Sequence, residues 1–178
     1  MKKNVILFVG FCVLLIITFL FYFKEDKTNF KTPHLISFEE QQVLKNYDWS
    51  LIGLDGDSFN LIVKAKKVIV IKYFSLTNEE SKKELDVFNK IYNDFKTKVD
   101  FVIIVEDKQP EVRSYLKEND FLFPVCYSLS KPPFEFESKN KSFRSLVISP
   151  SGRIVIDNYE PINWDSDEVR DVLNGLTK

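Results

Sequence analysis

Hydrophobic and polar positions divide the chain into one long apolar segment near the N-terminus and a succession of shorter apolar runs after it. The long segment, residues 4–23, contains no charged side chain in 20 residues, which is enough for a helix to cross the hydrocarbon core of a bilayer. A cleavable signal peptide has a shorter apolar region that ends in small residues, whereas this segment ends in FLFYF. The pattern therefore predicts an uncleaved transmembrane signal anchor over residues 1–23.

The charges that flank this segment indicate its orientation. Lys2 and Lys3 lie in the short N-terminal tail, and positive charge favours the cytoplasmic side of a membrane. The remainder of the chain would then lie outside the cytoplasm. The frequent use of Lys, Asn, Ile and Phe favours a bacterial cell. We therefore expect a single-pass protein of the bacterial inner (cytoplasmic) membrane with a periplasmic C-terminal domain.

The polar region after the span differs from the rest of the chain. Residues 24–46 have no sustained hydrophobic period, which is typical of a tether, and a folded domain is predicted over residues 47–178. The chain has 178 residues, of which 44% are hydrophobic and 29% charged. This length favours one folded domain rather than two.

Two pairs of a strand and a helix are predicted at the centre of the domain. KVIVIKYF, residues 67–74, is a β-branched run typical of a strand that is buried on both faces of a helix-covered sheet. The next segment has apolar residues at helical spacing and a capping box of Thr77 and Glu80 at its start. VDFVIIVE, residues 99–106, is a second buried strand, and Pro110 begins a second helix. This alternation predicts parallel strands with right-handed crossovers.

Shorter apolar runs predict the remaining elements. YDWSLIGLDGDSF contains an Asp-Gly turn between apolar segments, which favours a hairpin, and FLFPVCYSL is a short strand. RSLVIS and IVIDNY form a second hairpin around the turn PSGR. A closing helix follows in DSDEVRDVLNGL, where we expect Asp165 to cap the helix together with Glu168.

The balance of charge excludes one broad class of partner. After the predicted span the chain has 26 acidic and 23 basic residues, a net charge of about −3, and it has no block of basic residues. Proteins that bind nucleic acid carry a basic patch or stripe that contacts the phosphates. We therefore expect no nucleic-acid partner.

Cysteine and histidine are too few for most metal and redox sites. Cys12 lies in the predicted span, which leaves Cys126 alone outside the membrane, and His34 is the single histidine. A disulfide framework needs paired cysteines, and zinc or haem sites need several Cys, His or Met ligands. We expect no metal and no cofactor, and the sequence identifies no small-molecule substrate. Cys126 is predicted to lie in the core and His34 in solvent.

Taken together, these elements resemble a known family. Five segments between about Tyr47 and Leu176 carry the resemblance: DWSLIGLDGDSF, KVIVIKYFSLTNEESKKELDVFNKIYNDF, FLFPVCYSLSKPPFEF, LVISPSGRIVI and NWDSDEVRDVLNGL. In order and content they resemble the membrane-tethered, thioredoxin-like thiol-disulfide oxidoreductases of the TlpA type, which are related in fold to the peroxiredoxins. The resemblance implies an α/β, thioredoxin-like fold in which helices flank a central mixed sheet.

The positions that carry the chemistry of this family are occupied by other residues. The family has a Cys-x-x-Cys pair where the central strand meets the helix, and these positions fall on Asn78 and Ser81. A cis-proline close to the pair falls on Phe143. Glu79 and Glu80 stand between the two cysteine positions, where carboxylates would raise the pKa of a thiol but stabilise the start of a helix. The chain thus resembles a redox-inactive member of the family.

Three functions stay open, of which the first is favoured. A membrane-anchored, extracytoplasmic thioredoxin-fold protein without redox catalysis would be an accessory or scaffold subunit of a membrane complex, in contact with the lipid bilayer and a protein partner. A thiol-disulfide oxidoreductase or peroxiredoxin-like enzyme would need Cys126 or the cysteines of a partner. In the third, the transmembrane helix alone makes the functional contact.

Aromatic side chains around the redox positions are candidates for contact with a partner. They are Phe74, Phe143, Phe134 and Phe136, the last two in the segment KPPFEF of residues 131–136. An exposed aromatic patch would favour binding, and packing inside the domain is the alternative.

Overall fold

A computed structural model describes residues 30–138 and 143–178 of the chain. The predicted transmembrane segment, residues 4–23, and the first residues of the predicted tether lie outside this part, so the anchor stays a prediction. No helix of the described residues is both long and apolar enough to cross a bilayer.

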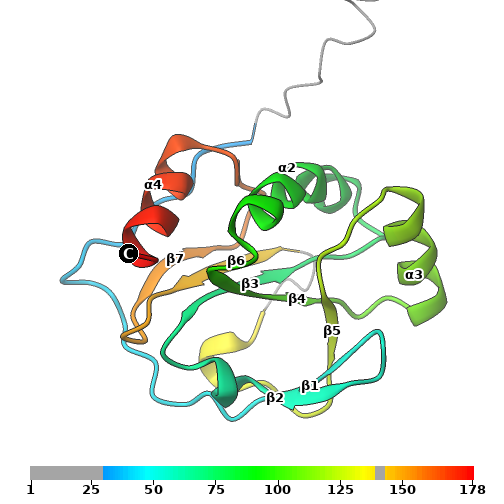
Figure 1. The fold of residues 1–178 in the computed structure, drawn as a ribbon, viewed down its shortest axis with the longest axis horizontal. Helices are drawn as coiled ribbons and strands as arrows, with labels where there is room; N and C mark the ends of the chain where they lie inside the picture. The colour runs from blue at the N-terminus through cyan, green and yellow to red at the C-terminus, as the bar shows by residue number, and fades with distance from the viewer. Residues whose placement is uncertain (1–29, 139–142) are drawn as a thin grey trace, which may run out of the picture.

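In the described residues, seven strands form one mixed sheet (Figure 1). The strands are β1 (Ser50–Gly53), β2 (Ser58–Asn60), β3 (Val68–Tyr73), β4 (Val99–Ile104), β5 (Val125–Ser128), β6 (Arg144–Ile148) and β7 (Ile154–Asn158). Their order across the sheet is β2-β1-β5-β4-β3-β6-β7. The strands β3, β4 and β5 run parallel, and the strand pairs at both ends of the sheet are antiparallel. The predicted parallel pair and both predicted hairpins are confirmed.

Glycine makes the turns of the two hairpins feasible. Gly56, between β1 and β2, has a φ of 96°, and Gly152, between β6 and β7, has a φ of 81°. These values lie in the left-handed region, which glycine adopts without a steric penalty. The turn residues read from the sequence therefore explain where each hairpin reverses.

The described α-helices lie on one face of the sheet (Figure 1). They are α2 (Glu79–Phe95), α3 (Gln109–Glu118) and α4 (Asp167–Leu176). The core on this face includes Phe88 of α2, Val112 of α3 and Leu173 of α4. Phe88 meets Phe101 and Trp164 edge to face, with ring centroids 5.7 and 5.0 Å apart, a geometry that aromatic rings favour.

The opposite face is covered in a different way. Two 3₁₀ turns, η1 (Leu61–Lys64) and η2 (Phe134–Phe136), and the chain that leads into β1 pack on it. Trp49 is fully buried there and stacks with Tyr73 and Phe136, whose ring centroids lie 6.4 and 5.5 Å away. The predicted central strand β3 is buried on both faces, with the described α-helices on one of them. Aromatic side chains and short turns fill the space on the second face.

Two helices begin one residue later than predicted. Asn78 rather than Thr77 is the N-cap of α2, and its side chain accepts a hydrogen bond from the backbone N–H of Ser81. Ser166 rather than Asp165 is the N-cap of α4. Asn, Ser, Thr and Asp all suit an N-cap. Two suitable residues stand next to each other at both helix starts, and only the backbone geometry decides between them.

Part of the predicted tether packs against the domain. Residues 30–46 follow the outer edge of β7, where the backbone N–H of Ile36 donates to the carbonyl of Val155 at 3.0 Å and that of Leu44 to Gly152 at 2.8 Å. Leu44 is buried in the core. These bonds cover an edge that would otherwise expose unpaired backbone groups. The packed part of the chain therefore extends upstream of the predicted domain start.

Candidate functional site

The loop between β3 and α2 is where the resemblance places the redox pair. The Oδ1 atom of Asn78 accepts a hydrogen bond from the backbone N–H of Ser81 at 3.1 Å. The hydroxyl of Ser81 accepts one from the backbone N–H of Ser75, also at 3.1 Å, and Ser81 is fully buried. The two side chains at the cysteine positions therefore stabilise the helix start and the loop that precedes it.

Asp107 holds the same loop from the end of β4. Its carboxylate accepts hydrogen bonds from the backbone N–H of Leu76 at 3.0 Å and from the hydroxyl of Ser75 at 3.3 Å. Glu79 and Glu80 follow in the first turn of α2, where the helix dipole favours negative charge. This loop contains caps and carboxylates but no thiol, and disulfide exchange requires a thiolate.

Phe143 stands directly before β6, where the resemblance places a cis-proline. Its side chain is 6% exposed, and no peptide bond within residues 30–138 and 143–178 is cis. The ring centroid lies 5.8 Å from the Nζ of Lys72, within the range of a cation–π interaction. Phe143 therefore packs beside a buried charge.

Lys72 and Glu84 form an ion pair in the core beneath α2. The Nζ of Lys72 lies 2.6 Å from the Oε2 of Glu84, and neither side chain is exposed. The Oε1 of Glu84 accepts hydrogen bonds from the indole N–H of Trp164 at 2.9 Å and from the backbone N–H of Ile162 at 3.1 Å. One carboxylate therefore connects β3, α2 and the segment that leads into α4.

Burial and ion pairing have opposite effects on the pKa of Lys72. Removal from water lowers the pKa of the Lys72 ammonium below its ordinary value, and the Glu84 carboxylate opposes this change. A buried charge is tolerated when it is paired and hydrogen-bonded, as it is here. The sequence contains a signal for both residues. Lys72 is a charged residue within a β-branched run, and Glu84 stands four residues before Phe88 on the apolar face of its helix.

We expect Lys72 and Glu84 to be strongly coupled in their effect on stability. Lys72→Met leaves a buried carboxylate without its partner and Glu84→Gln leaves a buried ammonium, so each should lower the free energy of unfolding by about 3–5 kcal/mol. The double variant removes both charges and should cost less than either single change. Urea unfolding of the full-length protein, followed by circular dichroism, measures the free energy of unfolding of the unaltered protein, the two single variants and the double variant. Additive effects of the two changes would contradict the coupling.

Cys126 lies on the other side of the sheet from α2. It belongs to β5 and is 3% exposed, inside the core that contains Trp49. Burial raises the pKa of the Cys126 thiol to about 11, a change that Lys64 opposes and Asp55 assists. Such a thiol is protonated at neutral pH and is a poor nucleophile. The prediction of a buried core cysteine is confirmed, and His34 is exposed as predicted.

Cys126 should therefore resist thiol reagents in the folded protein. In a Cys12→Ser variant Cys126 is the remaining thiol of the chain. At pH 8 we expect iodoacetamide to modify it about 100-fold more slowly in native buffer than in urea, because burial and the raised pKa both oppose reaction. Mass spectrometry at timed intervals measures the two rates. Similar rates in both solutions would show an accessible, reactive thiol.

The raised pKa of Cys126 also predicts a dependence of stability on pH. Between its ordinary value of 9.0 and the folded value of about 11, the unfolded chain loses the thiol proton while the folded chain keeps it. The contribution of this thiol is therefore fully present below pH 9 and is lost as the pH rises toward 11. A Cys126→Ala variant should show a smaller loss of stability over this interval in urea unfolding. An unchanged loss would contradict this assignment.

Three of the four aromatic candidates for a partner contact lie in the interior. Phe74 and Phe136 are fully buried, and Phe143 is nearly so. Phe134 differs, because 85% of its surface is exposed. The three buried rings are packing residues in this structure, and Phe134 alone is kept as a candidate contact.

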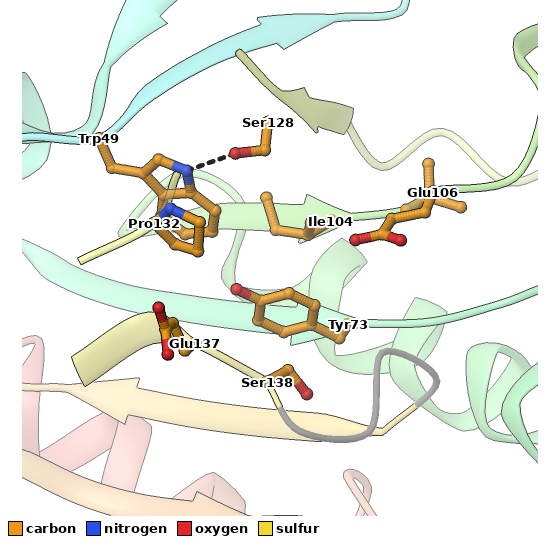
Figure 2. Close-up of a pocket in the computed structure, with 9 residues that line it drawn as sticks. Trp49, Tyr73, Ile104, Glu106, Ser128, Pro132, Glu137 and Ser138 are labelled. Carbon is orange, nitrogen blue, oxygen red and sulfur yellow. Dashed lines mark hydrogen bonds between the residues drawn. The ribbon is translucent and has the colours of Figure 1, made fainter. Parts of the chain in front are cut away.

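A pocket of about 300 Å³ lies at the carboxyl ends of β3 and β4 (Figure 2). It is lined by Trp49, Tyr73, Ile104, Val105, Glu106, Ser128, Pro132, Glu137 and Ser138. The indole N–H of Trp49 donates to the hydroxyl of Ser128 at 2.7 Å, and the Tyr73 hydroxyl donates to the carbonyl of Phe136 at 2.6 Å. The walls come from segments far apart in the chain, which is why no sequence motif marks the pocket.

The sheet order and the position of the α2 start define a thioredoxin-like fold, which solved structures confirm. The secreted thiol-disulfide isomerase of Corynebacterium glutamicum superposes with a TM-score of 0.60 at 14% identity, over 87% of this chain and 95% of that chain. A DsbF homologue of Corynebacterium diphtheriae superposes with a TM-score of 0.61 at 17% identity, over 86% of this chain and 99% of that chain. A thioredoxin-family thiol:disulfide interchange protein of Chlorobium tepidum superposes with a TM-score of 0.62 at 16% identity, over 77% of this chain and 98% of that chain.

These identities are low, so the likeness establishes the fold and leaves the activity open. No protein-family model and no curated protein matches the sequence. The chain is therefore similar in fold to secreted thiol-disulfide oxidoreductases, and its function has to be argued from its own residues.

Proposed function

We propose that the chain is a membrane-anchored, extracytoplasmic thioredoxin-fold protein without redox catalysis, and that it is an accessory or scaffold subunit of a membrane protein complex. One observation carries this proposal. Asn78 and Ser81 stand at the two cysteine positions, and their side chains are engaged in hydrogen bonds at the start of α2. The chain would thus be a redox-inactive relative of the TlpA-type oxidoreductases.

The chemistry of disulfide exchange supports the absence of catalysis. Exchange requires a thiolate that attacks a sulfur atom and a second thiol that resolves the mixed disulfide. The amide of Asn78 and the hydroxyl of Ser81 can perform neither step. Cys126 is the one cysteine of the described residues and lies in the core on the other face of the sheet. A catalytic cycle would need thiols supplied by a partner.

Two features support a location outside the cytoplasm. The uncharged segment at residues 4–23 and the lysines before it favour an anchor in the bacterial inner membrane with the folded domain in the periplasm. The C. glutamicum isomerase, which has the same fold, is a secreted protein. A location in the envelope would bring the domain close to other membrane proteins.

The proposal predicts that the full-length protein does not accelerate the reduction of insulin disulfides by dithiothreitol. An Asn78→Cys/Ser81→Cys variant is the positive control, because it places two thiols at a helix N-terminus, where thiolates are stabilised. We expect measurable but slow turnover from it, since Glu79 and Glu80 raise the pKa of nearby thiols. The precipitation of insulin chains, followed by turbidity, measures the rate.

The outcome that would overturn the proposal is specific. Turnover by the unaltered protein that disappears in a Cys126→Ser variant would identify a thiol-disulfide oxidoreductase or peroxidase instead. Turnover in neither protein, together with activity of the double-cysteine variant, is the expected result.

The proposed role also predicts a stable partner. Affinity purification of the intact protein in mild detergent should recover at least one membrane-complex protein, and Phe134→Ser should reduce its recovery, because aromatic residues dominate interface energies. Leu122→Ser, at another exposed apolar side chain, is the matched control.

Replacement of residues 1–23 by an unrelated span tests whether the membrane helix alone makes the contact. A partner-free monomer would count against the scaffold role.

A further inference from the structure

The segment before the folded domain is fastened along the outer edge of β7. We name residues 31–44 the strap. At one end, the carbonyl of Lys31 accepts a hydrogen bond from the backbone N–H of Asn163 at 2.9 Å. At the other end, the backbone N–H of Leu44 donates to the carbonyl of Gly152 at 2.8 Å. Further backbone hydrogen bonds to β7 fasten Ile36 and Gln42. The strap is therefore part of the fold rather than a loose tether.

Side chains of the strap add to this attachment. Pro33 and Leu44 are buried. The guanidinium of Arg153 lies over the Phe38 ring, 4.1 Å from its centroid, and its Nη1 donates to the Phe38 carbonyl at 3.4 Å. Release of the strap would expose both the Leu44 side chain and the backbone groups at the edge of β7. The bound strap is therefore the stable arrangement.

This attachment shortens the connection between the predicted span and the first fixed point of the domain. The sequence predicts a tether over residues 24–46, which are 23 residues, but with the strap bound the seven residues 24–30 precede the contact at Lys31. Seven residues reach at most about 25 Å, whereas 23 residues reach about 80 Å. A domain of this size is about 35 Å across. Lys31 is therefore held too close to the bilayer to lie on the far side of the domain.

We propose that the strap holds one side of the domain toward the bilayer, namely β7 and the connection from β7 to α4, residues 159–166. The inference rests on the membrane anchor of the proposed function and specifies which side of the domain faces the lipid. In the described residues, β2 lies at the edge of the sheet opposite β7, six strand spacings or about 29 Å away along the sheet. The β1–β2 hairpin therefore points away from the bilayer and stays accessible to the extracytoplasmic part of a partner.

The surface that faces the bilayer is charged rather than apolar. Glu160, Asp167 and Glu168 are exposed there, and so is Lys31. Carboxylates are costly to place inside a bilayer, so this surface lies next to the lipid headgroups without entering the hydrocarbon. The short connection, rather than an affinity for lipid, sets the orientation.

Paramagnetic lipids test this orientation in the ¹⁵N-labelled, full-length protein. The protein is placed in nanodiscs of phosphatidylcholine and phosphatidylglycerol that contain a lipid with a gadolinium chelate on its headgroup, and the same lipid with lutetium is the diamagnetic reference. We expect relaxation enhancement at the amides of Tyr159 and Asn163 to exceed that at Asp57 and Phe59 of the β1–β2 hairpin by about fivefold or more, because the two regions lie on opposite edges of a sheet about 29 Å wide.

A longer connection separates the effect of the strap from direct contact with lipid. Insertion of about 16 Gly and Ser residues directly before Lys31 restores the reach of the full tether, and it should reduce the ratio of the two enhancements to about twofold or less. The same residues added after Lys178 are the matched control and should leave the ratio unchanged. Slow hydrogen exchange at the Leu44 amide shows that the strap stays bound in each variant.

Equal enhancement at both edges of the sheet in the unaltered protein would overturn the proposal. A ratio that survives the insertion would also overturn it, because the short connection would then not be the cause. Both results leave the membrane anchor intact. Absence of enhancement at every amide would instead contradict the anchor itself, and cysteine-dependent reduction of insulin would contradict the non-catalytic role.

Discussion

The buried carboxylate of Glu84 needs hydrogen-bond donors and a counter-charge inside the core. The groups that supply them connect three parts of the domain. The two carboxylate oxygens receive the Lys72 ammonium, the Trp164 indole and the Ile162 backbone N–H. Loss of any donor would leave part of a buried charge unpaired, at a cost of several kcal/mol in such settings. The orientation of α2 on β3 and the entry of the chain into α4 are therefore fixed by the same group.

The fixed position of α2 determines what its N-terminus can do. In a thiol-disulfide enzyme the free N–H groups at a helix start stabilise a thiolate. Here Asn78 accepts a bond from one of these groups, and two glutamates occupy the first turn. The positive end of the helix is thus compensated by the chain itself. At this helix start the side chains of the described residues stabilise the helix, and no thiol stands among them.

The sequence predicts the parts of this fold that depend on local patterns. The β-branched run of β3, the glycine turns at Gly56 and Gly152 and the apolar face of α2 all follow from residue type and spacing. The cap at Asn78 is missed by one residue, because its neighbour Thr77 is an equally good candidate. The Lys72–Glu84 pair and the pocket depend on residues that only the tertiary fold brings together. Spacing along the chain cannot reveal such contacts.

The two faces of the sheet consequently have different capacities for binding. On the helical face, side chains satisfy one another, as the bonds to Glu84 show. On the other face, turns and irregular chain rather than a helix cover the sheet, and segments of this kind carry binding sites more often than regular elements do. The pocket lies at the carboxyl ends of β3 and β4, and Tyr73 and Ile104 of this face form part of its wall. The non-helical face therefore contains a cavity, whereas the side chains at the α2 start are engaged in hydrogen bonds within the domain.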